Sequence, residues 1–155
     1  MHNFKELKIW QKARILVKVV YDITSRFPEK ERIGLTSQLQ RAVVSIPTNI
    51  AEGSGRNTNK DFARFLDIAI SSSFEVETEI ILSHDLGYIS ENELNETVSK
   101  IQEIQKMIFG YIKTIVKNSL SPDPGSFVLC LDSWFLYLIS HSMIFKINNL
   151  LKYGP

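Results

Sequence analysis

Residues 38–56 read QLQRAVVSIPTNIAEGSGR, and this stretch decides the fold. Its apolar residues recur at spacings of four and three, which indicates one face of an amphipathic helix. This face comprises Leu35, Leu39, Val43, Ile46 and Ile50. Pro47 lies inside the pattern, where a proline removes an amide donor and costs about 3 kcal/mol. Because the apolar face must outweigh that cost, we predict a continuous helix with a kink, in which Ser45 and Thr48 bond the carbonyls that the proline leaves free.

Polar residues and glycines crowd the end of this helix. Asn49 and Glu52 either bond backbone groups around the kink, which we favour, or contact a ligand or a neighbouring subunit. Gly53 and Gly55 are typical of a helix end with a left-handed residue. The Gly-Ser-Gly-Arg run could also cradle a phosphate, but it lacks the spacing of a phosphate loop and a preceding strand. A structural motif of Pro47, Asn49, Glu52 and Gly53 is therefore the expected reading.

Three further segments show helical spacing. One covers residues 6–27, one begins after Thr58, and one runs from after Ser90 to about Asn118. Thr58 with Asp61, and Ser90 with Glu93, have the spacing of capping boxes. The positions of the three seams are Ile9, Ala13, Leu16, Val20, Ile23 and Phe27; Phe62, Leu66, Ala69, Ser73, Val76 and Ile80; and Leu94, Val98, Ile101, Ile104, Ile108, Ile112 and Ile115, all apolar except Ser73. Four helices with short connections predict an all-α, antiparallel up-down-up-down four-helix bundle.

Composition is that of a globular protein, with 44% hydrophobic and 23% charged residues among 155. A chain of this length can bury a substantial core in one domain. The single cysteine, Cys130, excludes an internal disulfide and a zinc cluster and favours a reducing compartment. Charges scattered through the first residues leave no apolar core of a secretory signal. These features predict a cytoplasmic protein.

The last part of the chain differs from the rest. We place the bundle at residues 1–119 and an apolar C-terminal tail at residues 120–155, after the breaker SPDPGS. The tail falls short of a membrane span because Asp132 interrupts it. Three interpretations of the tail stay open: a segment packed on the bundle, an interfacial anchor, and a sequence without function.

Charge is distributed unevenly along the chain. Residues 1–64 hold twelve Lys or Arg against six Asp or Glu, whereas residues 65–155 hold six against eleven. Such asymmetry can mark a face for nucleic acid, but it can also reflect basic helices lying against acidic ones. If the face exists, its candidate phosphate contacts are Lys5, Lys8, Lys12, Arg41, Arg56, Lys60 and Arg64.

The acidic residues Glu75, Glu77 and Glu79 raise the question of a metal site. A di-iron bundle needs Glu-x-x-His spacing on two helices, which is absent here, and His84 falls near a helix end. We interpret the cluster as an acidic outer face. Without metal spacing, a nucleophile-base pair or a cofactor loop, the sequence predicts no enzyme, no metal, no cofactor and no small-molecule substrate.

Four segments together carry a resemblance to a known family. They are FKELKIWQKA, FPEKERIGLTSQLQRAVVSIPTNIAEGSGR, KDFARFLDIAISSSFEVETEI and HDLGYI. In order and spacing they resemble the bacterial four-helix bundle proteins of the 23S rRNA intervening-sequence family, from about Phe4 to Ser119. The family's central motif is matched at Arg41, Ala42, Ser45, Ile46, Pro47, Asn49, Ile50, Ala51, Glu52 and Gly53. Ser71 departs from it, because the family usually has glycine there.

The resemblance implies a bundle that assembles into a homopentamer, and it implies no known activity. A relative of similar fold, the accessory protein of diversity-generating retroelements, is a basic pentamer that binds nucleic acid and a reverse transcriptase. We therefore hypothesise a non-enzymatic oligomeric scaffold that binds RNA or DNA through phosphates. The alternative is a protein-protein interaction module with no affinity for nucleic acid.

Overall fold

A computed structural model describes residues 3–117 of the chain, and these residues form four long helices. The helices are α1 (Lys8–Thr24), α2 (Leu35–Ser54), α3 (Asn59–Asp85) and α4 (Glu91–Lys117). Short 3-10 helices, η1 (Phe4–Glu6) and η2 (Glu29–Glu31), precede α1 and α2. The described part of the chain has no strand, which confirms the all-α fold class.

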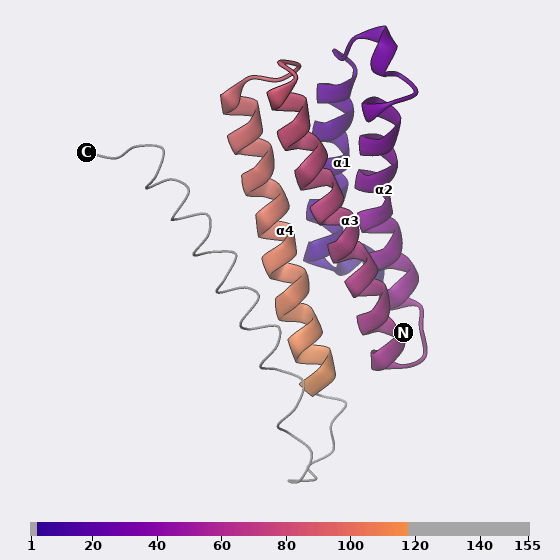
Figure 1. The fold of residues 1–155 in the computed structure, drawn as a ribbon. Helices are drawn as coiled ribbons and strands as arrows, with labels where there is room; N and C mark the ends of the chain where they lie inside the picture. The colour runs from indigo at the N-terminus through magenta and orange to yellow at the C-terminus, as the bar shows by residue number, and fades with distance from the viewer. Residues whose placement is uncertain (1–2, 118–155) are drawn as a thin grey trace, which may run out of the picture. The chain divides into compact units, whose positions relative to one another are not determined.

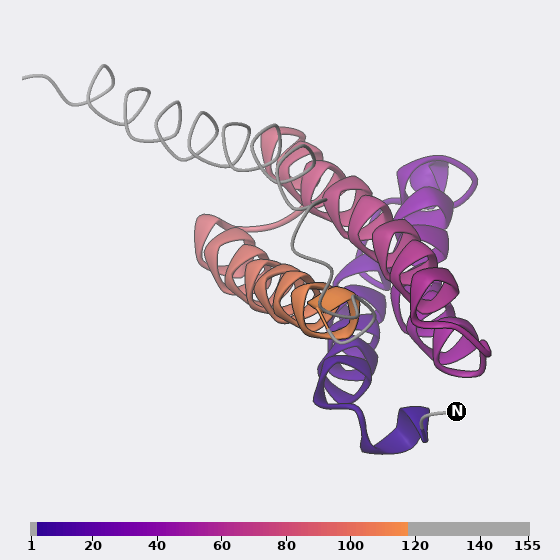
Figure 2. The same ribbon diagram turned by 90° about the horizontal axis from the view of Figure 1, so that it is seen from below.

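Consecutive helices run in opposite directions and pack against each other (Figure 1). Because the connections are short, α1 and α3 begin, and α2 and α4 end, at the same end of the bundle. Figure 2 looks onto that end. Contacts within the bundle agree with this placement, since the Asn59 side chain donates to the carbonyl of Ile115, at 3.3 Å.

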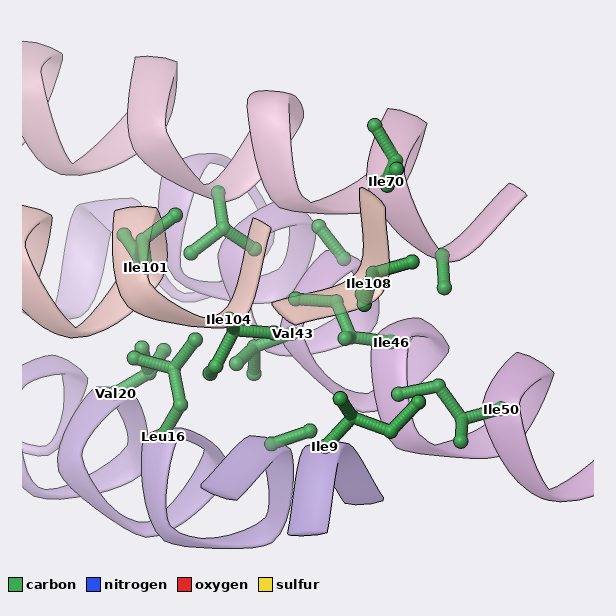
Figure 3. Close-up of a cluster of buried hydrophobic side chains, with 14 of the residues drawn as sticks. Ile9, Leu16, Val20, Val43, Ile46, Ile50, Ile70, Ile101, Ile104 and Ile108 are labelled. Carbon is green, nitrogen blue, oxygen red and sulfur yellow. The ribbon is translucent and has the colours of Figure 1, made fainter. Parts of the chain in front are cut away.

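The apolar seams predicted from the sequence form the core. On α1, α2 and α3 almost every seam residue is buried, and Ile101, Ile104 and Ile108 of α4 close the core from the fourth side (Figure 3). Phe27, Leu94, Val98 and Ile112 are only half-buried and pack around the buried cluster, and Leu35 is also half-buried. The core is therefore one continuous cluster that all four helices share.

The helix containing the proline stays continuous, as predicted. Pro47 is buried within α2, which extends seven residues beyond it. The Thr48 hydroxyl donates to the Val44 carbonyl at 2.8 Å, while the Ser45 hydroxyl lies 2.8 Å from that of Ser72 on α3. In an ordinary helix the amide of residue 47 would donate to the Val43 carbonyl, but Pro47 has no amide hydrogen. Neither hydroxyl bonds that carbonyl, so the hydrogen bonds differ from those predicted.

Both predicted capping boxes start helices. Thr58 accepts a hydrogen bond from the Asp61 amide at 3.0 Å, and α3 begins at the next residue. The Ser90 amide donates to the Glu93 carboxylate at 2.9 Å, and the Glu93 amide donates to the Ser90 hydroxyl at 3.4 Å. These reciprocal bonds satisfy amides that a helix leaves unpaired at its first turn.

The left-handed helix end is at Gly87, and its prediction at Gly53 and Gly55 was wrong. Gly87 has φ 75°, and no other described residue has positive φ. The Tyr88 amide donates to the Ser83 carbonyl at 2.9 Å and the Gly87 amide to the His84 carbonyl at 2.8 Å, a Schellman end for α3. Gly55, by contrast, has an ordinary φ of −84°.

No helix in the described region is long and apolar enough to cross a membrane. The predicted tail, residues 120–155, lies outside the described residues, and so do all three of its interpretations.

Candidate nucleic-acid interface

Six of the seven predicted phosphate contacts lie in η1, in the first two turns of α1 and α3, and in the connection between α2 and α3. Lys12 lies furthest from the end of the bundle, since its partner Glu103 is roughly 20 Å from the end of α4. Lys5 lies in η1 and Lys8 begins α1, while Lys60 and Arg64 occupy the start of α3. Arg56 lies in the connection between α2 and α3. We define the basic end as Lys5, Lys8, Lys12, Arg56, Lys60 and Arg64. The up-down order of the helices explains why segments far apart in sequence reach the same end of the bundle (Figure 2).

Two members of the basic end are partly neutralised. The Lys12 ammonium lies 2.8 Å from the Glu103 carboxylate of α4. Arg56 is paired with Glu52, and its guanidinium also lies 4.5 Å from the ring centre of Phe65. The other four members are exposed and form no ion pair with the described residues. Four cations of the basic end therefore remain outside ion pairs, and Glu6 of η1 and Asp61 of α3 are the exposed carboxylates next to them in sequence.

Two of these cations, Lys8 and Lys60, lie at helix N-termini, where the helix dipole disfavours positive charge. Lys8 is the first residue of α1, whose first turn has no acidic residue, and Lys60 is the second residue of α3. The start of a helix carries a partial positive charge, so cations there lose stability on the order of 0.3–1 kcal/mol each. Lys60 and Arg64 are also like charges four residues apart, which adds a smaller penalty.

Arg41, the seventh candidate, lies away from the basic end. It is on the middle of α2, fifteen residues before Arg56, which is roughly 20 Å along the helix. The structure therefore does not bring Arg41 together with the other six. It lines a groove of about 780 Å³ between α1 and α2, together with Arg32, Tyr21 and a set of hydroxyl and amide side chains. The hydroxyl and amide residues are Thr24, Ser25, Thr36, Ser37, Gln40, Ser45, Thr48 and Asn49.

A second, more apolar groove of about 490 Å³ is lined by residues of η1, α1 and α2. It shares Val44 and Thr48 with the first groove, so the two grooves are neighbours on α2. Trp10 in this groove is already engaged, by the ring of Phe4 at 5.0 Å and by the guanidinium of Arg14 at 4.9 Å.

The contacts of the predicted structural motif differ from residue to residue. The Asn49 amide donates to the Ser45 carbonyl at 2.8 Å and to the Ser45 hydroxyl at 3.0 Å, one turn earlier on α2. Glu52 contacts Arg56 rather than the backbone. Gly53 is buried inside α2, where an added Cβ would lie 2.7 Å from Phe62 and 2.7 Å from Phe65. Gly53 thus allows close helix packing, and the role of the whole motif stays a prediction.

The expected acidic outer face is reduced to Glu75, because the other two carboxylates turn inward. Glu77 accepts hydrogen bonds from Gln102 and Gln105 of α4, at 3.1 and 2.9 Å. Glu79 is 5% exposed, and its Oε2 has no hydrogen-bond partner among the described residues. Burial, reinforced by the Glu75 charge and opposed by that of Arg41, raises the pKa of Glu79 to about 7. No group of three metal-binding side chains was found in residues 3–117.

Sequence reasoning missed four residues near these surfaces. Lys113 and Lys117 lie in the last turns of α4, at the same end of the bundle as the six basic residues. The predicted up-down order of the helices already implies that the end of α4 lies beside the start of α3, so it could have identified these two lysines. Tyr21 and Arg32 line the first groove. Only the side-by-side packing of α1 and α2 reveals that groove, and no single motif signals it.

Comparisons with known proteins agree with the observed helices. The sequence model of the 23S rRNA-intervening sequence protein family matches residues 5–110. Among solved structures, the chain is similar to a protein of unknown function from the S23 ribosomal protein family of Bacteroides thetaiotaomicron VPI-5482. The two are 23% identical with a TM-score of 0.64, over 68% of this chain and 98% of that one, which shows a shared fold. None of the curated proteins matches the chain.

Proposed function

The chain belongs to the 23S rRNA-intervening sequence protein family, and from that membership we propose that it is a non-enzymatic oligomeric scaffold that binds RNA or DNA through phosphates. The basic end is the contact surface in this proposal. Assembly into a homopentamer and a bacterial cytoplasmic location belong to the same proposal. The single cysteine among 155 residues supports a reducing compartment.

One observation supports the proposal: four exposed cations lie at the basic end and form no ion pair with residues 3–117. Glu75, Glu77 and Glu79 do not neutralise them, since the described ion pairs of the basic end involve only Glu52 and Glu103. Lys8 and Lys60 also lie at helix starts, which disfavour cations, although Asp61 follows Lys60 in the first turn of α3. Residues that oppose local stability rules are commonly placed for function.

An oligomer would strengthen such a surface. Phosphate contacts at one basic end are individually weak, and five copies on one particle would act together. Linked weak contacts gain about 100-fold or more in apparent affinity when the geometry lets them engage at once. Phosphate contacts alone carry no sequence information, so we expect broad rather than sequence-specific binding.

The test measures binding of the purified full chain to a ribosomal RNA fragment, unrelated RNA and DNA at about 50 and 200 mM salt. Light scattering on the same sample gives the mass of the binding species. With four phosphate contacts per binding event, affinity should fall about 100-fold between the two salt concentrations. An affinity that did not change with salt concentration would contradict the proposal of phosphate binding. A monomeric binding species would contradict the proposed oligomer.

A variant pair makes the test specific to the basic end. Replacing Lys60 and Arg64 with Gln removes two exposed cations that form no ion pair in the described structure. This variant should reduce the slope of log affinity against log salt by about two. The matched control replaces Lys18 and Lys106, exposed cations outside the basic end, and should leave the slope unchanged. No binding by a well-folded oligomer would favour the alternative, a protein-protein interaction module.

A further inference from the structure

The groove between α1 and α2 has the chemistry of a binding site for an anion. It is an open groove with a volume of about 780 Å³. Its only charged lining residues are Arg32 and Arg41, and neither Asp nor Glu lines it. Eight hydroxyl or amide side chains complete most of its wall. Guanidinium groups recognise phosphate through paired hydrogen bonds, which neutral donors can extend.

Arg41 is the less paired of the two arginines that line the groove. It is exposed and forms no ion pair within the described structure, whereas Arg32 lies 3.1 Å from Glu29. The carboxyl that attracts Arg41 is Glu79 on α3. Because burial raises the pKa of Glu79 to about 7, this carboxyl is largely protonated below that pH and compensates Arg41 only in part. Arg41 is therefore the stronger phosphate contact of the two.

Tyr21 adds an aromatic surface beside these cations. It is 44% exposed, lines the same groove, and takes part in no ring pair of the described residues. An open aromatic face beside a cation is the usual platform for a base of a single strand. Nearby, the side-chain amides of Gln40 and Asn49 donate to Thr24 and Ser45, which leaves their carbonyl oxygens without partners in residues 3–117.

We propose that this groove binds a single-stranded segment of nucleic acid, with one base stacked on Tyr21 and an adjacent phosphate held by Arg41. The inference rests on the proposed function and narrows it, because it assigns single strands to a site separate from the basic end. A paired base is stacked within its duplex and cannot lie on Tyr21, so duplexes engage only the basic end. In this proposal the amide oxygens of Gln40 and Asn49, which line the same groove, accept hydrogen bonds from base amino groups.

The experiment compares a single-stranded RNA of about 12 nucleotides with the duplex of the same sequence, by fluorescence anisotropy on the full chain. Tyr21→Leu should weaken single-strand binding about tenfold and change duplex binding by less than about twofold, since one stacked base is lost. Tyr21→Phe is the matched control and should bind single strands as the parent does. Arg41→Gln should reduce the salt slope for single strands by about one.

The outcomes separate this inference from the proposed function. If neither nucleic acid binds, both fail. If the parent binds both and Tyr21→Leu weakens neither, the groove inference is overturned while the basic end stands. Equal losses on both nucleic acids would also overturn it, because stacking on Tyr21 requires an unpaired base. A thermal unfolding curve for each variant identifies any loss of binding that comes from unfolding.

Discussion

Gly53 lies where α2 and α3 pack without room for a side chain. A Cβ at this position would approach the Cβ of Phe65 to 2.7 Å, and that atom cannot move without its helix. Overpacking of this kind costs about 1–3 kcal/mol, so Gly53→Ala should lower the free energy of unfolding by roughly 2 kcal/mol in urea denaturation.

The control for this substitution is two residues away. A Cβ at Gly55 would meet only the Glu52 carbonyl at 3.5 Å, and Gly55 has an ordinary φ of −84°. Gly55→Ala should therefore be neutral or slightly stabilising. Equal destabilisation by both substitutions would contradict the close-packing role of Gly53.

Glu79 makes stability depend on pH. Its pKa in the folded state is raised to about 7 from an ordinary value of 4.5, so the folded protein holds a proton that the unfolded chain releases. The contribution of Glu79 to stability is thus full below about pH 4.5 and is lost as the pH rises through 7. Glu79→Gln mimics the protonated form and should be more stable than the parent by roughly 2 kcal/mol at pH 8, with little difference at pH 5.

Urea denaturation at the two pH values measures this difference. Glu75→Gln provides a comparison, because Glu75 is exposed and raises the pKa of Glu79 only as a neighbouring charge. It should give a smaller change in the same direction. A Glu79→Gln protein that lost as much stability as the parent between pH 5 and pH 8 would show that another group titrates.

At the scale of the helices, the sequence predicted the core residues that recur with the helical period. It did not predict features that depend on the packing of one helix against another. Ile9, Leu16 and Val20 were expected in the α1 core because they recur with the helical period, and all are buried. Gly53 was interpreted as a helix end, because a glycine needed for close packing has the same appearance in sequence as a terminal one. The close approach of Phe65 decides between the two, and it exists only in the folded protein.

The start of α4 shows how one side chain links two helices. Glu93 accepts from the Ser90 amide and also from Arg26 beside the end of α1, at 2.6 Å. The Ser90 backbone bond, the bond from Arg26 and that from the Ser90 hydroxyl together lower the pKa of Glu93 to about 2. Its stabilising contribution is therefore present above the ordinary value of 4.5 and is lost as the pH falls toward 2.

Glu93→Gln should remove part of this acid dependence. At pH 7 the variant should lose about 1 kcal/mol, since the exposed ion pair and the charge at the helix start are both lost while the cap geometry is kept. Below about pH 3 the parent and the variant should converge. Denaturation from pH 2.5 to 7 measures the difference, and a gap that widened toward acid would contradict the sign of the shift.

At the scale of the whole molecule, the fold brings charges together that the sequence keeps apart. The sequence placed its candidate contacts in residues 1–64 but could not tell that Arg41 would stand apart from the other six. The alternation of helix direction decides this, because it carries the starts of α1 and α3 to one end and leaves the middle of α2 on the side (Figure 1). Arg41, Tyr21 and Arg32 meet only through the packing of α1 on α2.

The basic end should therefore cost stability while it supports binding. Lys60 opposes the dipole at the start of α3 and repels Arg64 one turn later, so replacing both with Gln should raise the free energy of unfolding by about 0.5 kcal/mol at low salt. Screening at about 1 M salt should abolish that gain, because the repulsion acts between exposed charges. Chemical denaturation at both salt concentrations measures it, with Lys100→Gln as the control, since Lys100 pairs with Glu96 and its loss should not stabilise the protein. If the variant with Lys60 and Arg64 replaced were instead less stable at low salt, those cations would stabilise the fold. Their charge would then no longer support the proposal of nucleic-acid binding.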